Sequence, residues 1–142
     1  MAGGGGRERV SGASGALGKL TVLVVDDEPA IRDWVSRALA RAGIDVMAAA
    51  DGREALRLVA DGVVRPNVLL TDLEMPRMGG VELAARMDAL RPGIRIVMMT
   101  GDPVRAAEAR ERSEIVAAVL DKPFVIADLV AAIRPRPEPA TR

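Results

Sequence analysis

The chain has no histidine and no cysteine among its 142 residues. Without imidazole groups it has no His-based catalytic triad and no histidine metal ligand. Without thiols it has no disulfide bonds, no thiolate metal site and no cysteine nucleophile. Any chemistry must therefore come from carboxylates, hydroxyl groups, and the side chains of Lys and Arg.

The sequence also lacks an excess of one charge and a long apolar run. Twenty Lys and Arg residues balance 20 Asp and Glu residues, so the net charge does not indicate a nucleic-acid or anionic-membrane surface. No apolar run approaches the length that crosses a bilayer, and the apolar stretch 20–25 runs straight into two aspartates, unlike a secretory signal. We therefore expect a cytoplasmic protein with no membrane insertion and no direct contact with nucleic acid.

The two ends differ in composition from the middle of the chain. Residues 1–19 are rich in Gly and Ser without an apolar period, which predicts a flexible tail. Residues 135–142 are rich in proline and cannot continue a helix. One domain, spanning residues 20–134, is therefore expected between two tails.

Within this domain, strand-like apolar runs alternate with helical patterns. The first run, TVLVV, is continuous and branched, as in a strand that is buried on both faces. Helices are expected from Pro29, from the capping residue Asp51, after the loop 74–80, over 103–112, and up to residue 133. Strands are expected at residues 21–25, 44–49, 68–71, 94–99 and 116–120. This alternation with short connections predicts an α/β fold: a doubly wound, five-stranded parallel sheet with helices on both faces.

Charged and polar side chains follow four of these expected strands. They are Asp26, Asp27 and Glu28 after the first, then Asp72, Thr100 and Lys122. In such sheets ligands bind beyond the carboxyl ends of the strands, so we expect these side chains at one edge. Packed carboxylates either gain protons or bind a cation, and an all-oxygen site suits Mg²⁺. A metal-held carboxylate opposite a lysine and a hydroxyl is fitted to phosphoryl transfer onto that carboxylate.

Each of these residues also allows a simpler interpretation when taken alone. The acids before Pro29 could stabilise a helix N-terminus, and Thr100 could simply precede a helix. Asp72 could be an ordinary loop acid, and Lys122 a solvated surface lysine. These alternatives would all have to hold at once, and they do not explain why every position follows a strand. We therefore prefer the functional interpretation.

Four segments carry a resemblance to a known family. VLVVDDEP, LLTDLEMPRMGG, MMTG and LDKPF resemble, in order and spacing, the motifs of the receiver domain of bacterial two-component systems. The resemblance runs from about residue 21 to residue 133, and it implies a flavodoxin-like strand order of 2-1-3-4-5. It also implies a partner: a histidine kinase or histidine phosphotransfer protein whose phosphohistidine supplies the phosphoryl group.

The resemblance further implies a role for each site residue. Asp72 would accept the phosphoryl group, Lys122 would pair with its oxygens, and Thr100 would move to hydrogen-bond them. The Mg²⁺ ligands would be the side chains of Asp27 and Asp72 and the backbone carbonyl of Glu74, with Asp26 acting through a metal-bound water. Such a domain signals; it is not an enzyme on a separate substrate, and it catalyses only its own phosphorylation and dephosphorylation.

The chain departs from the family pattern at three places. Val119 stands where Tyr or Phe is usual, Gly101 stands where Ala is more usual, and no Ser or Thr cap precedes the last helix. Val119 is too short to act as a rotating aromatic switch, and its branched β-carbon restricts its rotamers. We therefore expect phosphorylation to be read out by shifts of backbone and helix around residues 101–112.

Two other functions share part of this pattern. A haloacid-dehalogenase-like phosphatase also uses an aspartate nucleophile, but its nucleophile follows the first strand and its acidic pair comes late in the chain. Here the pair comes first and Asp72 lies mid-chain. A phosphorylation-independent interaction module would not need the intact acids, Thr100 and Lys122. The sequence leaves open whether this is a single-domain regulator or the receiver of a hybrid kinase.

Overall fold

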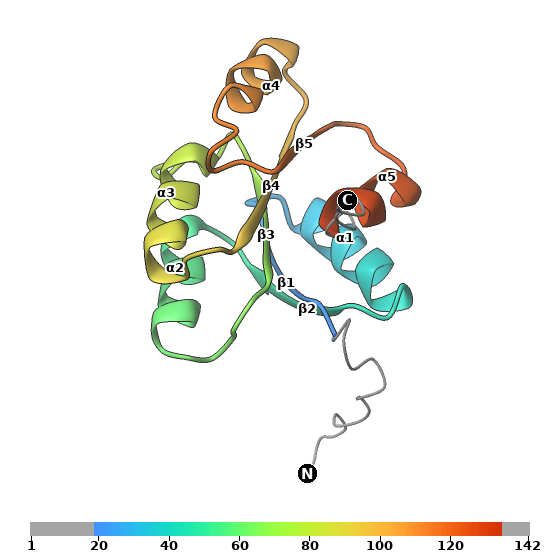
Figure 1. Cartoon of the computed structure of the whole chain (residues 1–142). Helices are drawn as coiled ribbons and strands as arrows, with labels where there is room; N and C mark the ends of the chain where they lie inside the picture. Colours follow the sequence, from blue (N-terminus) through green and yellow to red (C-terminus); the bar gives the residue numbers. More distant parts are fainter. Residues whose placement is uncertain (1–18, 135–142) are drawn as a thin grey trace, which may run out of the picture.

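A parallel sheet lies between two layers of helices in the computed structural model, which describes residues 19–134 (Figure 1). The expected tails fall outside the described residues, apart from Lys19. The elements in chain order are β1 (Thr21–Val25), α1 (Pro29–Arg41), β2 (Asp45–Ala49), α2 (Gly52–Ala60), β3 (Val68–Asp72), α3 (Gly80–Leu90), β4 (Arg95–Thr100), α4 (Pro103–Arg110), β5 (Ala118–Asp121) and α5 (Ile126–Ile133).

The sheet has five strands in the order β2-β1-β3-β4-β5, and every neighbouring pair is parallel. This confirms the doubly wound α/β fold and the order 2-1-3-4-5. Local signals begin the helices as expected: Pro29 opens α1, and Asp51 caps α2 by accepting a hydrogen bond from the Glu54 amide at 2.9 Å. No helix within the described range 19–134 combines the length and the hydropathy needed to span a bilayer.

The three central strands have apolar middles because helices cover both faces of the sheet. One face packs against α2, α3 and α4, and the other packs against α1 and α5 (Figure 1). The first layer buries strand residues Leu23, Val25, Leu69, Ile96 and Met98. The second buries strand residues Val22, Val24, Val68, Leu70, Val97 and Met99. The sheet is thus a rigid platform from which the strand ends project.

Helix α4 is attached to this platform by little apolar surface. Its buried residues are only Ala106 and Ala109, whereas α3 buries Leu83 and Met87. Burial stabilises roughly in proportion to apolar area, so α4 is held more weakly than α3. The sequence predicts this helix over residues 103–112, and in the structure it ends two residues earlier, at Arg110.

Two further details differ from the expectation. Strands β3, β4 and β5 each extend one residue beyond the predicted end. Asp72 and Thr100 are therefore the last residues of β3 and β4, and Lys122 directly follows β5. On α3, the sequence pattern allows either Leu90 or Leu83 on the core face, and the structure buries Leu83 fully while Leu90 is 46% exposed. Apolar residues at α3 fit two neighbouring faces of a helix, and the packing against the sheet decides which one is buried.

Candidate functional site

The carboxyl edge of the sheet brings the expected site residues together. Asp26 directly follows β1, and Asp72 ends β3, which pairs with β1. The Lys122 ammonium reaches across from the end of β5, 3.1 Å from Asp72 Oδ1 and 3.6 Å from Asp26 Oδ2. Thr100 is the last residue of β4, the strand that lies between β3 and β5.

Three carboxylates form a compact group at this edge. Asp26, Asp27 and Asp72 each offer an oxygen within 4.8 Å of the others. Asp26 and Asp72 are buried, whereas Asp27 is exposed. Asp26 Oδ1 accepts the Glu28 amide at 2.9 Å, but its buried Oδ2 has no hydrogen-bond partner among the described residues. This oxygen is ion-paired with Lys122 at 3.6 Å but accepts no hydrogen bond within the described part of the chain. Such an oxygen beside two further carboxylates fits a hard divalent cation, which takes oxygen ligands.

Burial and neighbouring charges both shift the pKa values of Asp26, Asp72 and Lys122. Burial, and then repulsion by Asp26, raises the pKa of Asp72 from 3.8 to about 6 against the attraction of Lys122. Burial also raises the pKa of the Asp26 carboxyl. For Lys122, burial lowers the pKa, but attraction to Asp72 and Asp26 outweighs it and raises the pKa above its usual value. The lysine is therefore a fixed cation, and Asp72 is a carboxylate whose charge is costly unless it is neutralised.

The Thr100 hydroxyl makes a contact that the sequence did not predict. Thr100 Oγ1 donates a hydrogen bond to Glu74 Oε2 at 2.6 Å and accepts one from the Asp102 amide at 3.0 Å. The resemblance involved only the backbone carbonyl of Glu74. Glu74 and Thr100 are 26 residues apart, and no sequence signal links a loop acid to a particular strand-end hydroxyl.

Two further residues shape the site from outside it. The Arg32 guanidinium donates to the Asp26 backbone carbonyl at 2.7 Å and so fixes the loop after β1. At Gly80, an added Cβ would lie 2.7 Å from the Asp72 carbonyl oxygen and 2.9 Å from Leu73 Cα. Only glycine allows the loop to return this close to Asp72. In the sequence, the glycine pair at residues 79–80 is the signal for this close contact between the loop and Asp72.

The match to known proteins covers the same elements. Residues 22–134 match the response regulator receiver domain. The chain belongs to this family. As a receiver domain, it is a signalling domain of two-component systems, which confirms the family that the motifs predicted.

Individual relatives agree with this assignment. The receiver is 36% identical over 115 residues to a DNA-binding transcriptional regulator NtrC of Azospirillum brasilense, covering 80% of this chain and 23% of the relative. It is 33% identical to a response regulator MprA of Mycolicibacterium vanbaalenii, covering 80% of this chain and 48% of the relative. The structure of the chemotaxis protein CheY4 of Vibrio cholerae superposes with a TM-score of 0.69 and 35% identity, covering 80% of the receiver and 94% of CheY4. The chain thus spans less than half of the length of the NtrC and MprA relatives.

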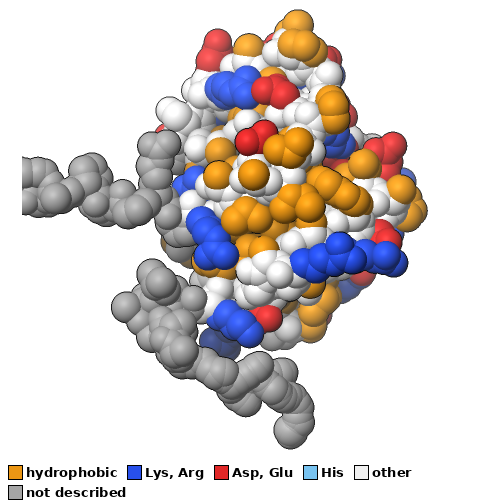
Figure 2. Space-filling view, turned by 90° about the vertical axis from the view of Figure 1, so that its right-hand side faces the viewer, with side chains coloured by type: hydrophobic (Ala, Val, Ile, Leu, Met, Phe, Trp, Pro, Cys, Tyr) orange, Lys and Arg blue, Asp and Glu red, His pale blue; other side chains and the backbone are white. Residues whose placement is uncertain are grey.

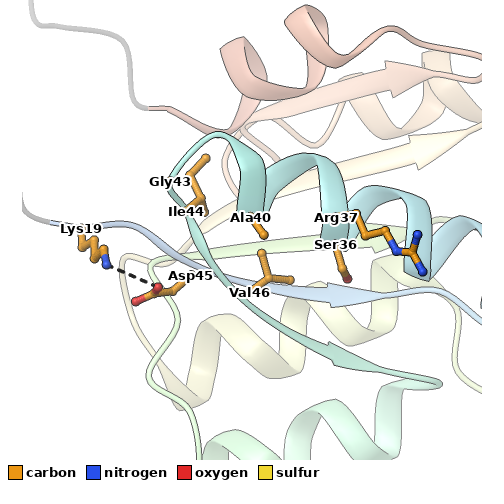
Figure 3. Close-up of a pocket in the computed structure, with 8 residues that line it drawn as sticks. All are labelled: Lys19, Ser36, Arg37, Ala40, Gly43, Ile44, Asp45 and Val46. Carbon is orange, nitrogen blue, oxygen red and sulfur yellow. Dashed lines mark ion pairs between the residues drawn. The ribbon is translucent and has the colours of Figure 1, made fainter. Parts of the chain in front are cut away.

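A surface hollow lies away from the acidic group. It has a volume of about 480 Å³ and lies between α1 and the edge strand β2 (Figure 3). Its lining includes Lys19 and Asp45, whose charged groups are 3.6 Å apart at the start of β2, the opposite end of the sheet from Asp72. The lining of this hollow therefore contains none of the residues that the sequence predicts for the site.

Proposed function

We propose that Asp72 of this receiver accepts a phosphoryl group from a phosphohistidine of a partner protein, and that the domain then signals by changing shape. One observation carries the proposal: a buried carboxylate at a strand end lies 3.1 Å from a lysine and within 4.8 Å of two further carboxylates. The acidic pair after β1 and the mid-chain position of Asp72 favour this function over a haloacid-dehalogenase-like hydrolase.

The side chains support an in-line transfer. A carboxylate oxygen of Asp72 attacks phosphorus, the phosphorus–nitrogen bond breaks, and its electron pair returns to the imidazole of the donor. The Lys122 ammonium faces the attacked position and stabilises charge on the phosphoryl oxygens. The Thr100 hydroxyl supplies a hydrogen bond to the same oxygens once it leaves Glu74. These 142 residues contain no histidine, so the phosphohistidine of the donor must lie outside them.

Mg²⁺ is the cofactor that this donor set suits. We propose that the side chains of Asp27 and Asp72 and the backbone carbonyl of Glu74 hold it, with Asp26 acting through a bound water. When bound, Mg²⁺ neutralises negative charge on the transferred group. Without it, the carboxylates at this edge repel one another, and Lys122 offsets part of that repulsion.

We propose that residues 20–134 form the receiver, that it acts in the cytoplasm without membrane insertion, and that it does not itself contact nucleic acid. It acts on itself alone, by taking up and losing the phosphoryl group. It is either a single-domain regulator or the receiver of a hybrid kinase.

Incubation with acetyl phosphate and Mg²⁺ should add one phosphoryl group, and peptide mapping should place it on Asp72. The bond should be labile to hydroxylamine, as an acyl phosphate is. Asp27→Ala should need a higher Mg²⁺ concentration for the same rate, because one proposed ligand is lost. A phosphoryl group on another residue, or an unchanged Mg²⁺ requirement in Asp27→Ala, would contradict the assignment.

A surface suited to the phosphodonor lies beside the site. Trp34 is 42% exposed, and its ring lies 5.8 Å from that of Phe124, two residues after Lys122. Val125 and Ile126 add exposed apolar side chains. Figure 2, which views the molecule from the side of α1 and α5, shows hydrophobic side chains gathered across the middle of this face. We propose that the histidine-bearing partner docks here, because α1 begins next to the acidic group and Phe124 follows the lysine.

Trp34→Ser should slow transfer from a phosphorylated partner kinase about tenfold, because exposed aromatic residues dominate such interfaces. Phosphorylation by acetyl phosphate should fall less than twofold, since a small donor needs no docking surface. Val63→Ser removes an exposed apolar side chain on a different part of the surface and serves as the control. Equal losses with both donors would place the defect in the site or in the fold and would exclude this docking surface.

A further inference from the structure

The Thr100 hydroxyl is already engaged before any phosphoryl group arrives. Its proton is directed to Glu74 Oε2 at 2.6 Å, and a lone pair accepts the Asp102 amide at 3.0 Å. A hydroxyl has only one proton to donate. Thr100 therefore cannot donate to Glu74 and to a phosphoryl oxygen on Asp72 at the same time, and the two acceptors compete for it.

We propose that the Glu74 carboxylate is a positioning residue that retains Thr100 in the resting arrangement and sets how readily the phosphorylated domain switches. The inference rests on the proposed phosphorylation of Asp72. Hydrogen bonds to a carboxylate are among the stronger ones, so the phosphoryl group must displace a substantial competitor. Glu74 is exposed, which leaves its side chain free to swing into solvent when Thr100 departs.

The same hydroxyl is connected to the start of α4. Asp102 is the N-cap of α4, and its Oδ1 accepts the amides of Val104 at 2.9 Å and Arg105 at 3.4 Å. Because the Asp102 amide donates to Thr100 Oγ1, a movement of that oxygen removes a hydrogen bond from the residue that begins the helix. Glu74, Thr100 and Asp102 thus form a continuous chain of contacts from the site to α4.

Helix α4 is suited to respond to such a change. Its core contacts are limited to Ala106 and Ala109, and its last turn is tied to β5 by Arg110, which donates to the Val119 carbonyl at 3.2 Å and to Asp121 at 2.9 Å. Elements with few buried apolar contacts open at low free-energy cost. This route needs no aromatic side chain at position 119, where Val119 is half-buried.

Hydrogen exchange of the unphosphorylated protein tests the contact directly. Glu74→Ala should speed exchange of the amides in residues 101–105 on the order of threefold, because the freed Thr100 hydroxyl leaves Asp102. Thr100→Val should do the same. Glu74→Gln keeps an oxygen acceptor and should restore much of the protection. Glu28→Ala is the matched control, since it removes an exposed acid from the same edge without touching Thr100.

Beryllofluoride with Mg²⁺, a mimic of the phosphoryl group, tests the competition. Glu74→Ala should bind it about threefold to tenfold more tightly, and Glu28→Ala less than twofold more tightly. In a Thr100→Val background, Glu74→Ala should gain no more than Glu28→Ala does, because the competition needs the hydroxyl. This double-mutant cycle separates a contact with Thr100 from a general effect of negative charge.

The outcomes are distinct. A Glu74→Ala gain that persists fully in the Thr100→Val background would overturn the positioning role and leave only a charge effect. Unchanged exchange over residues 101–105 in Glu74→Ala would overturn it as well. If no variant and not even the parent binds beryllofluoride, the proposed phosphorylation fails, and the exchange measurement still decides the Glu74–Thr100 contact by itself.

Discussion

Asp72→Asn should abolish phosphorylation by acetyl phosphate and, in metal-free buffer at pH 8, raise the free energy of unfolding by about 3 kcal/mol. Phosphorylation is lost because an amide cannot supply the nucleophilic oxygen of a carboxylate. Stability is gained because the amide side chain of the variant carries no charge for burial to penalise. Stability and phosphorylation are then expected to oppose each other at the proposed acceptor, as in the trade-off between stability and activity at many functional sites.

The gain in the free energy of unfolding that Asp72→Asn brings should depend on pH. Folding raises the pKa of Asp72 from 3.8 to about 6, chiefly through burial. Below pH 3.8 the carboxyl is protonated in both states and carries no penalty. Between that value and about 6, the folded state keeps the proton that the unfolded state releases, so stability is lost as the pH rises. Above about 6 the parent carries the full penalty, which Asp72→Asn avoids.

Urea unfolding in EDTA from pH 4 to pH 8 measures this difference. Asp61→Asn, which changes an exposed acid at the end of α2, should alter stability little at any pH and controls for net charge. Added Mg²⁺ should stabilise the parent more than Asp72→Asn, because the variant lacks one proposed ligand. Equal stability of parent and variant at pH 8, or a gain that persists unchanged at pH 4, would contradict the buried-charge account.

Gly80→Ala should lower the free energy of unfolding by about 2–3 kcal/mol and slow phosphorylation markedly. The added Cβ would lie 2.7 Å from the Asp72 carbonyl oxygen, a backbone atom that moves only if β3 or α3 moves. Alanine favours helices over glycine by up to about 1 kcal/mol, so a steric loss must exceed this gain. The loop after Asp72 would shift, and with it the backbone of the proposed acceptor.

Gly101→Ala is the matched control for this prediction. An added Cβ there would meet only Lys122 Cβ at 3.9 Å, an ordinary contact. Its stability should stay within about 0.5 kcal/mol of the parent, as for substitutions that make no new clash. Unfolding curves of both variants, with phosphorylation rates from acetyl phosphate, separate the two cases. A Gly80→Ala protein as stable as Gly101→Ala would show that the loop relaxes without cost.

Much of the fold follows from local sequence. The continuous branched run TVLVV favours a strand covered on both sides, and Pro29 and Asp51 begin helices through their own backbone and side-chain chemistry. The edge that gathers Asp26, Asp72 and Lys122 follows from the same periodicity, because parallel strands place their carboxyl ends together. Side-chain identity and strand direction were sufficient for this part of the site.

The tertiary structure decided the rest, because it depends on distances between segments that sequence does not specify. The choice of Leu83 over Leu90 for the core required the helix to be placed against the sheet. The raised pKa of Asp72 required its actual burial and its actual neighbours. The hydrogen bond between Glu74 and Thr100 joins residues with no shared local pattern. Sequence by itself determined which groups reach the edge; packing determined their protonation, their partners and the resting position of Thr100.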